Sequence, residues 1–239
     1  MSGHSKWSTI KHKKAALDAK RGKVFTKVVK EITVAARLGG GDPATNARLR
    51  LLIDKAKAAN MPGENIIRAI KKGTGELPGV AYEAHTYEGY GPYNIAIIVE
   101  VLTDNKNRSV AELRRAFTLA GGSLAETGAV NWMFSKLGVI RGTTQLLEDQ
   151  LLEKLLEYDI HTLSIDPEDQ SVIITGNPKQ LDTIRHAAHT AGVTVSDAEF
   201  EWVAPQKISL DPENEKKAYS FLEELEELED VQNIYTNLD

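Results

Sequence analysis

The sequence contains no cysteine among its 239 residues. Disulfide bonds, thiolate metal sites and a cysteine nucleophile are therefore excluded, and a reducing compartment is compatible with this composition. No apolar run approaches the length needed to span a bilayer, and the N-terminal residues lack the apolar segment of a secretory signal. We therefore expect a cytoplasmic protein without a membrane partner.

Motifs that carry catalysis are also missing. The sequence has no P-loop, no HExxH metal motif and no G-x-S-x-G nucleophile motif. The best case for an enzyme is a pair of carboxylates, Asp104 with Glu88 or Glu83, that would bind Mg²⁺ for phosphodiester cleavage. Nothing in the sequence brings these residues together, and the six histidines are scattered. We expect no catalytic residue, no metal site and no cofactor, with a magnesium-dependent nuclease as the alternative.

Charge is divided very unevenly along the chain. Residues 1–72 contain 17 Lys and Arg against 5 Asp and Glu, a net charge of +12. Residues 73–239 contain 12 Lys and Arg against 29 Asp and Glu, a net charge of −17. A block of such positive charge repels itself unless it meets a polyanion, and nucleic acid is the usual one.

Helical periodicity organises most of the basic block. Apolar residues recur at i, i+3, i+4 and i+7 in 20–38, and shorter apolar stripes follow in 43–59 and 63–72. Glycines end the first helix, and Asp42 with Pro43 is the expected start of the second. The residues expected to face inward are Val24, Phe25, Val28, Val29, Ile32, Ala35, Ala36, Leu49, Leu52, Ile53, Ala56, Ile66, Ile67 and Ile70. The cations expected to face outward are Lys20, Lys23, Lys27, Lys30, Arg37, Arg48, Arg50, Lys55, Lys57, Arg68, Lys71 and Lys72.

The cations favour nucleic-acid binding over an ordinary solvated surface. A solvated surface would interleave acidic partners, but only Glu31, Asp54 and Glu64 lie within the three helices. Trp7 belongs to the lysine-rich segment 2–14, where it either stacks on a base or packs against the helices. Phosphate contacts need no special geometry. The predicted binding residues are Lys6, Trp7, Lys11, Lys13, Lys14, Lys20, Arg21, Lys23, Lys27 and Lys30.

The acidic remainder alternates strands and helices. A strand-helix-strand unit is expected in 94–134, ending in a strand at 129–134, and a β-α-β-β-α-β set in 137–203. A further unit is expected to begin with a strand at 207–210 and to end with one at 231–235. The predicted fold class is α+β, a helical bundle followed by two ferredoxin-like domains, one inserted in the other. The predicted domains are 1–75, a basic helical domain with a mobile N-terminal arm, 76–136 plus 204–239, and 137–203.

Two short segments have both structural and functional interpretations. The segment from Tyr87 to Pro92 is either a plain turn, which we favour, or a hairpin tip that presents aromatic rings to RNA bases. A strand-to-helix junction contains Asp104, Asn105, Asn107 and Arg108. Helix capping is favoured there over contact with a ligand.

Several motifs resemble the YebC/PmpR family, which includes the mitochondrial translational activator of cytochrome oxidase. The similarity is dense over about residues 1–140 and looser afterwards. The motifs are GHSKW at 3–7, KHKKAALDAKRGKVFTK at 11–27, GGGDPATNARLRLLIDKAKAANMPGENIIRAIKKGTGE at 39–76, YEGYGP at 87–92, TDNKNR at 103–108 and GAVNWMFSKLGVI at 128–140.

The resemblance implies a non-enzymatic, three-domain cytoplasmic factor that acts on gene expression. Members are described as DNA-binding transcriptional regulators or as ribosome-associated factors that assist translation. The resemblance therefore implies duplex DNA or ribosomal RNA as the partner, with the ribosome itself as a further candidate. The sequence does not indicate an oligomeric state, and we favour a monomer.

Overall fold

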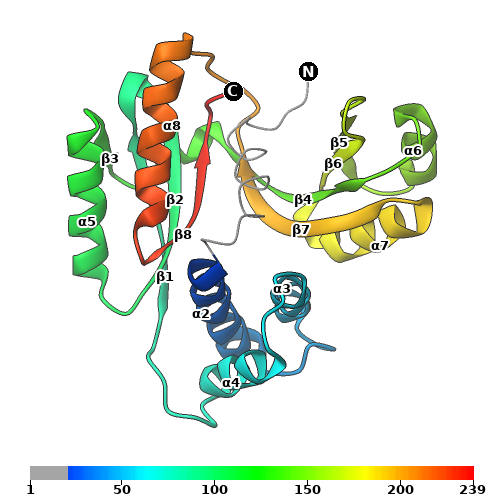
Figure 1. The fold of residues 1–239 in the computed structure, drawn as a ribbon, viewed down its shortest axis with the longest axis horizontal. Coiled ribbons are helices and arrows are strands. Elements are labelled where there is room, and N and C mark those ends of the chain that lie inside the picture. Colours follow the sequence, from blue (N-terminus) through cyan, green and yellow to red (C-terminus); the bar gives the residue numbers. More distant parts are fainter. Residues whose placement is uncertain (1–20) are drawn as a thin grey trace. The chain divides into compact units, whose positions relative to one another are not determined.

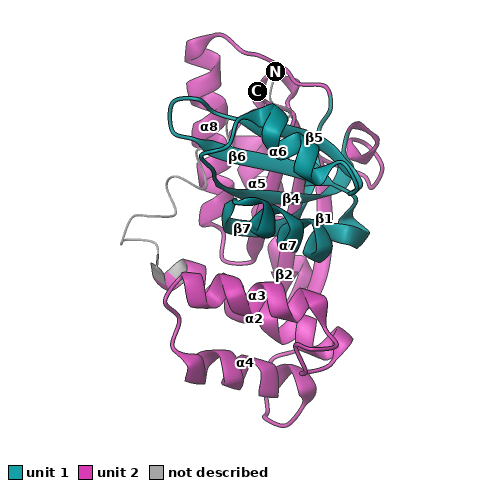
Figure 2. Ribbon diagram, turned by 90° about the vertical axis from the view of Figure 1, so that its right-hand side faces the viewer, with its two compact units in different colours: residues 1–4, 134–205 teal, residues 5–133, 206–239 magenta. Residues whose placement is uncertain are grey.

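The computed structural model describes residues 21–239, apart from the side chains of Arg21 and Lys23. The described chain has three helices followed by two four-stranded antiparallel sheets that carry further helices (Figure 1). The predicted α+β class is therefore confirmed. Among the described residues, 134–205 form one compact unit, and 21–133 with 206–239 form the other (Figure 2).

The three N-terminal helices are α2 (Arg21–Gly39), α3 (Ala47–Ala58) and α4 (Gly63–Thr74). Helices α2 and α4 approach each other closely at Gly73, where an added Cβ would lie 2.4 Å from the carbonyl oxygen of Thr33. Only glycine fits there. The buried core of this bundle consists of Val28, Ile32, Ala35, Leu49, Leu52, Ala56, Met61, Ile66 and Ala69.

Two expectations for this bundle are wrong. The second helix starts at Ala47 with Asn46 as its N-cap, whereas Asp42 accepts a hydrogen bond from the Ala44 amide in the preceding turn. Asn46 is the better placed cap because its buried amide also donates to the carbonyl oxygens of Ala35 and Gly40, each at 2.9 Å. Ile67, expected to face inward, is 56% exposed.

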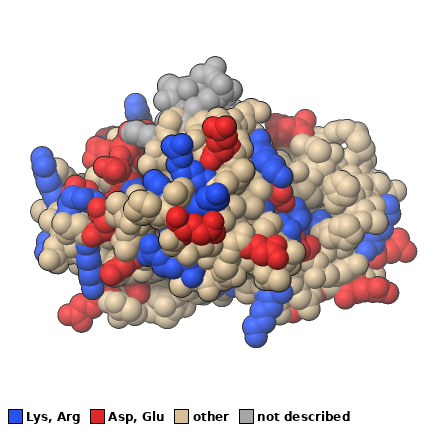
Figure 3. Space-filling view, turned by 90° about the horizontal axis from the view of Figure 1, so that it is seen from below, with Lys and Arg blue, Asp and Glu red and all other residues tan. Residues whose placement is uncertain are grey.

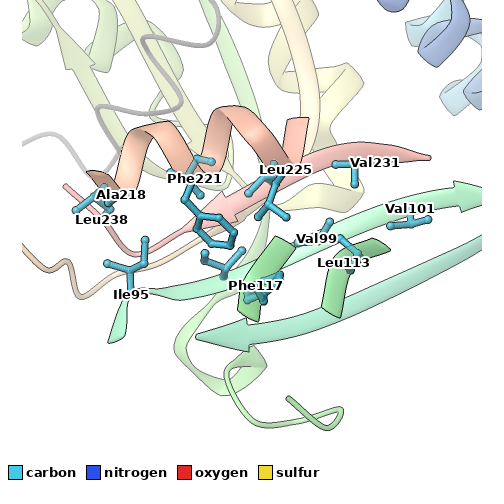
Figure 4. Packing of buried hydrophobic residues seen from close by; sticks show 13 residues of the cluster. Ile95, Val99, Val101, Leu113, Phe117, Ala218, Phe221, Leu225, Val231 and Leu238 are labelled. Atoms are coloured by element: carbon cyan, nitrogen blue, oxygen red, sulfur yellow. The ribbon is translucent and has the colours of Figure 1, made fainter. Parts of the chain in front are cut away.

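The first sheet belongs to the unit that contains these helices. Its strands β1 (Glu83–Tyr90), β2 (Ala96–Thr103), β3 (Ser123–Ala125) and β8 (Val231–Thr236) lie in the order β3-β1-β2-β8. Helices α5 (Lys106–Leu119) and α8 (Pro212–Glu227) cover one face (Figure 1). The rings of Phe117 on α5 and Phe221 on α8 pack edge to face, with their centres 5.1 Å apart (Figure 4). They belong to the buried core between the two helices and the sheet.

Two strands predicted for this sheet differ in the structure. Residues 129–134 are not a strand, because the buried Glu88 carboxylate accepts hydrogen bonds from the amides of Gly128, Val130 and Asn131 and holds them in a loop. A short 3-10 turn, Asn131–Met133, follows. The strand expected at 207–210 is reduced to one bridge between Ile208 and Leu238.

The second sheet forms the unit 134–205. Strands β4 (Ser135–Thr143), β5 (Ile160–Ile165), β6 (Ser171–Gly176) and β7 (Thr194–Val203) lie in the order β5-β6-β4-β7. Helix α6 (Glu148–Leu155) joins β4 to β5, and α7 (Leu181–Ala191) joins β6 to β7. This is the β-α-β-β-α-β order expected from the sequence. None of the helices in the described chain is both long and apolar enough to span a membrane.

Candidate nucleic-acid interface

Most of the predicted binding residues precede the described part of the chain. Lys6, Trp7, Lys11, Lys13, Lys14 and Lys20 lie outside the described residues. Arg21 and Lys23 lie in the first turn of α2. The structure therefore describes α2 from Arg21 onward, together with the side chains of Lys27 and Lys30.

Lys30 does not face solvent, so its predicted position on the outer face of the helix is wrong. Its side chain is 5% exposed, and its Nζ lies 3.1 Å from Oδ1 of Asp230. The same Nζ donates to the carbonyl oxygen of Glu229 at 3.2 Å and lies 5.4 Å from the centre of the Tyr82 ring. Lys27, one turn earlier and half-buried, donates to the carbonyl oxygen of Glu226 at 3.4 Å. Lys30 is thus a structural residue that attaches α2 to the segment directly before β8, in the first sheet.

Asp230 is the centre of this fastening. Its Oδ2 accepts hydrogen bonds from Thr103 at 2.9 Å, from Arg108 at 2.8 Å and from Ser109 at 2.8 Å. Burial disfavours the charged carboxylate, but the hydrogen bonds from Arg108, Ser109, Thr103 and Lys30 outweigh it and lower the pKa of Asp230 to about 2. One carboxylate therefore connects α2, the end of β2, the start of α5 and the start of β8.

Among the described side chains of the helical part, the exposed cations are Arg37 on α2, which donates to the carbonyl oxygen of Tyr82 at 3.5 Å, and five on α3 and α4. Arg48, Lys57, Arg68, Lys71 and Lys72 are exposed, and none of them forms an ion pair with any other residue in the described chain. The three on α4 follow i, i+3, i+4 spacing and so share one face of the helix. Free cations on a folded surface are available to phosphate groups.

The face of the molecule in Figure 3 shows how these charges are distributed. Lys and Arg side chains are scattered over it, with Asp and Glu side chains among them (Figure 3). Residues 21–72 alone contain 12 Lys and Arg against 4 Asp and Glu. The positive charge is therefore concentrated by sequence position, while the face shown carries both signs.

Of the carboxylates considered for a nuclease, Glu88 lies away from the other two. Glu83 pairs in the sheet with Thr103, next to Asp104, whereas Glu88 lies five residues further along β1, about 17 Å away at ~3.3 Å per residue. Burial raises the pKa of Glu88, but three backbone amide hydrogen bonds outweigh it, and the net pKa is lowered. Glu88 is thus committed to holding the 128–131 loop.

Tyr87 to Tyr90 form the end of strand β1, so the turn expected at 87–92 lies later, around Pro92–Asn94, whereas the capping segment has the role favoured from the sequence. Tyr87 and Tyr90 are half-buried rather than displayed, and the Tyr90 hydroxyl donates to the carbonyl oxygen of Ala129 at 3.1 Å. Asn105 caps α5 by accepting from the Arg108 amide at 3.2 Å. Asp104 lies 2.9 Å from the Arg108 guanidinium.

A charged network in the unit 134–205 was not expected from the sequence. Asp197, Glu199 and Glu201 alternate along β7, with carboxylate oxygens within 4.8 Å of one another. The buried Arg141 on β4 donates to Glu201 at 2.9 Å and lies 3.7 Å from Asp197. The guanidinium supplies one positive charge among three carboxylates, and its pairing with Glu201 is a buried salt bridge within this acidic cluster. The alternation of acidic residues was its only sequence signal.

Comparisons with known proteins cover nearly the whole chain. Residues 5–76 match the family described as "TACO1/YebC protein N-terminal domain", and residues 82–238 match "TACO1/YebC second and third domain". A "Probable transcriptional regulatory protein" of Trichlorobacter lovleyi is 50% identical over 239 residues, covering 100% of this chain and 96% of its own.

Two further relatives agree with these matches. A protein of the same description from Chlorobaculum tepidum is 50% identical over 240 residues, covering 100% of this chain and 95% of its own. The crystal structure of a conserved hypothetical protein from Aquifex aeolicus superposes with a TM-score of 0.85 at 41% identity, covering 94% of this chain and 93% of that one.

Proposed function

The chain belongs to the TACO1/YebC family, and from this premise we propose that it is a DNA-binding regulator of transcription. The names of relatives that are 50% identical along the whole chain support regulation of transcription. The observation that carries the proposal is the group of unpaired cations on α3 and α4. The lysine-rich segment 2–14, which precedes α2 in the sequence, adds to this charge.

The proposed DNA contacts are electrostatic and spread over the N-terminal part. They retain the cations predicted from the sequence, except Lys30, and they add those that the helices leave unpaired. The proposed contacts are Lys6, Trp7, Lys11, Lys13, Lys14, Lys20, Arg21, Lys23, Lys27, Arg48, Lys57, Arg68, Lys71 and Lys72. Contacts of this kind position a protein on the phosphate backbone without reading base sequence.

We propose that the acidic part of the chain, residues 73–239, has no catalytic role. With a net charge of −17 in residues 73–239, it repels nucleic acid from most of its surface and so directs binding to the helices. We further propose action in the cytoplasm, a domain division at 1–75, 76–136 plus 204–239, and 137–203, and no cofactor.

Binding of a labelled DNA duplex tests the proposal. The variant R68Q/K71Q/K72Q removes three unpaired cations from one face of α4. The logarithm of the DNA-binding constant changes with the logarithm of the salt concentration by about −0.9 for each phosphate contact. Losing one contact at ~0.15 M salt therefore weakens binding about fivefold. The expected loss is about 100-fold if all three contact phosphate.

The matched control is K179Q/K216Q/K217Q, which removes the same charge from the acidic part. It should change affinity by less than about threefold. Equal losses in the two variants would show that only net charge matters and would refute an interface on α4.

Ribosomal RNA is the competing partner. Crosslinking in cells, followed by sequencing of the bound nucleic acid, distinguishes the two. The proposal predicts enrichment of DNA at promoters, and recovery of ribosomal RNA alone would replace transcription by a role at the ribosome.

A further inference from the structure

Helix α5 is a basic element within the acidic part of the chain. It contains Lys106, Arg108, Arg114 and Arg115, and Glu112 is its only carboxylate. Residues 73–239 as a whole have a net charge of −17. The net charge of α5 is +3, opposite in sign to that of the surrounding sequence, so this helix is a candidate to bind an anion.

Three of the four basic residues of α5 have no acidic partner in the described chain, and the fourth, Arg108, pairs with Asp104 and Asp230. Lys106, Arg114 and Arg115 are exposed, and within the described chain none of them forms an ion pair. Glu112 stands three residues before Arg115 but does not pair with it. A purely solvated helix surface gains stability from such i, i+3 and i, i+4 pairs, so their absence leaves this charge available for an external ligand.

Neutral residues separate the cations on the exposed side of α5. Asn107, Ala111 and Thr118 are exposed between the cations, and all three are small or neutral. Arg114 and Arg115 are adjacent in the sequence, both exposed and neither paired with a carboxylate, whereas Arg108 is paired with Asp104 and Asp230. Two neighbouring unpaired cations suit adjacent phosphates of one strand.

The neighbouring helix α8 has the opposite charge. It contains six glutamates, at 213, 215, 223, 224, 226 and 227, against two lysines. The two helices pack on the same sheet face through Phe117 and Phe221 (Figure 4). The helical layer is therefore polarised, and a polyanion is attracted to α5 and repelled from α8.

The Asp230 carboxylate connects α5 to α2. Asp230 accepts from Arg108 and Ser109 at the start of α5 and pairs with Lys30 of α2. All of these residues belong to one compact unit. The two basic elements are thus held at a fixed separation, as a two-part binding surface requires.

From these observations we propose that the exposed face of α5 is a second phosphate-binding surface. It would contact the backbone of the same DNA duplex that the N-terminal helices bind, through Lys106, Arg114 and Arg115. This inference rests on the proposed function, because it assigns a second contact region to the same ligand.

The full-length variant R114Q/R115Q tests the proposal with a mixed-sequence DNA duplex of about 30 base pairs. Affinity is measured by fluorescence anisotropy over a salt series. Two lost contacts should weaken binding about 30-fold at ~0.15 M salt and reduce the steepness of the log–log salt dependence by about 1.8. The matched control K179Q/K216Q removes two exposed, unpaired lysines and should leave that steepness unchanged.

Each outcome decides a different question. If the wild type does not bind DNA, the proposed function fails. If the wild type binds and R114Q/R115Q binds equally well, only the second surface is refuted. If R114Q/R115Q instead alters self-association in sedimentation experiments while DNA affinity is unchanged, the face binds a second copy of the chain. If R114Q/R115Q weakens binding to duplex RNA but not to duplex DNA, the assignment of this surface to DNA is also overturned.

Discussion

Replacing Asp230 with asparagine should destabilise the protein strongly, because it leaves the Lys30 ammonium buried without its counter-ion. Lys30 is 4% exposed and 3.1 Å from the Asp230 carboxylate. Breaking a buried pair from one side typically costs about 3–5 kcal/mol. We expect D230N to lower the free energy of unfolding by about 3 kcal/mol and to increase hydrogen exchange of the α2 amides.

The opposite substitution should cost less. K30M leaves Asp230 with hydrogen bonds from Thr103, Arg108 and Ser109, so we expect a loss of about 1–2 kcal/mol. The double variant K30M/D230N no longer buries an unpaired lysine. Its loss should therefore be smaller than the sum of the single losses by at least about 1.5 kcal/mol.

Urea unfolding followed by circular dichroism measures these differences, and hydrogen exchange locates them. A D230N loss below about 1 kcal/mol, or additive single losses, would refute the view that this pair fastens α2 to the sheet domain.

The same carboxylate gives a pH dependence with a defined sign. The pKa of Asp230 falls from an ordinary value of 3.8 to about 2 on folding. The corresponding stabilisation, about 2.5 kcal/mol, is present above pH ~4 and disappears as the pH falls through ~2. The wild type should therefore lose more stability than D230N between pH 4 and pH 2 in thermal melts.

Three further substitutions probe the packing. G73A should cost about 1–3 kcal/mol in urea unfolding, because its Cβ would meet a main-chain oxygen of α2 at 2.4 Å, whereas G63A, which meets nothing within 4 Å, should be neutral or stabilising; equal effects would refute the close approach. N46A should lower the free energy of unfolding by about 2 kcal/mol, because it removes both the helix cap and the two hydrogen bonds that the amide donates. N46D should keep the cap and lose only the two donated hydrogen bonds, so equal stability of N46A and N46D would contradict the dual role of Asn46. R141M should destabilise the unit 134–205 by about 3–5 kcal/mol because it leaves the Glu201 carboxylate buried without the guanidinium, and partial recovery in R141M/E201L would confirm the pairing.

Local periodicity was sufficient to predict the helices and most strands. The apolar stripes of α2, α3 and α4 set their inward faces, and the β-α-β-β-α-β order of 134–205 follows from alternating periods. These signals arise from neighbours a few residues apart, so they can be read from the sequence.

The errors share a different physical origin, which is contact between distant residues. Lys30 looked like a surface cation because its partner Asp230 is 200 residues away. The loop at 128–131 looked like a strand because Glu88, which binds its amides, stands about 40 residues earlier. Such pairings appear only when the fold brings the elements together.

The salt dependence of DNA binding tests the central claim most directly. If six to ten phosphate contacts form, a log–log plot of the binding constant against salt should have a slope of about −5 to −9, and R68Q/K71Q/K72Q should reduce its magnitude by about 2.7. A slope near zero, or one that this variant leaves unchanged, would contradict an electrostatic interface on the N-terminal helices.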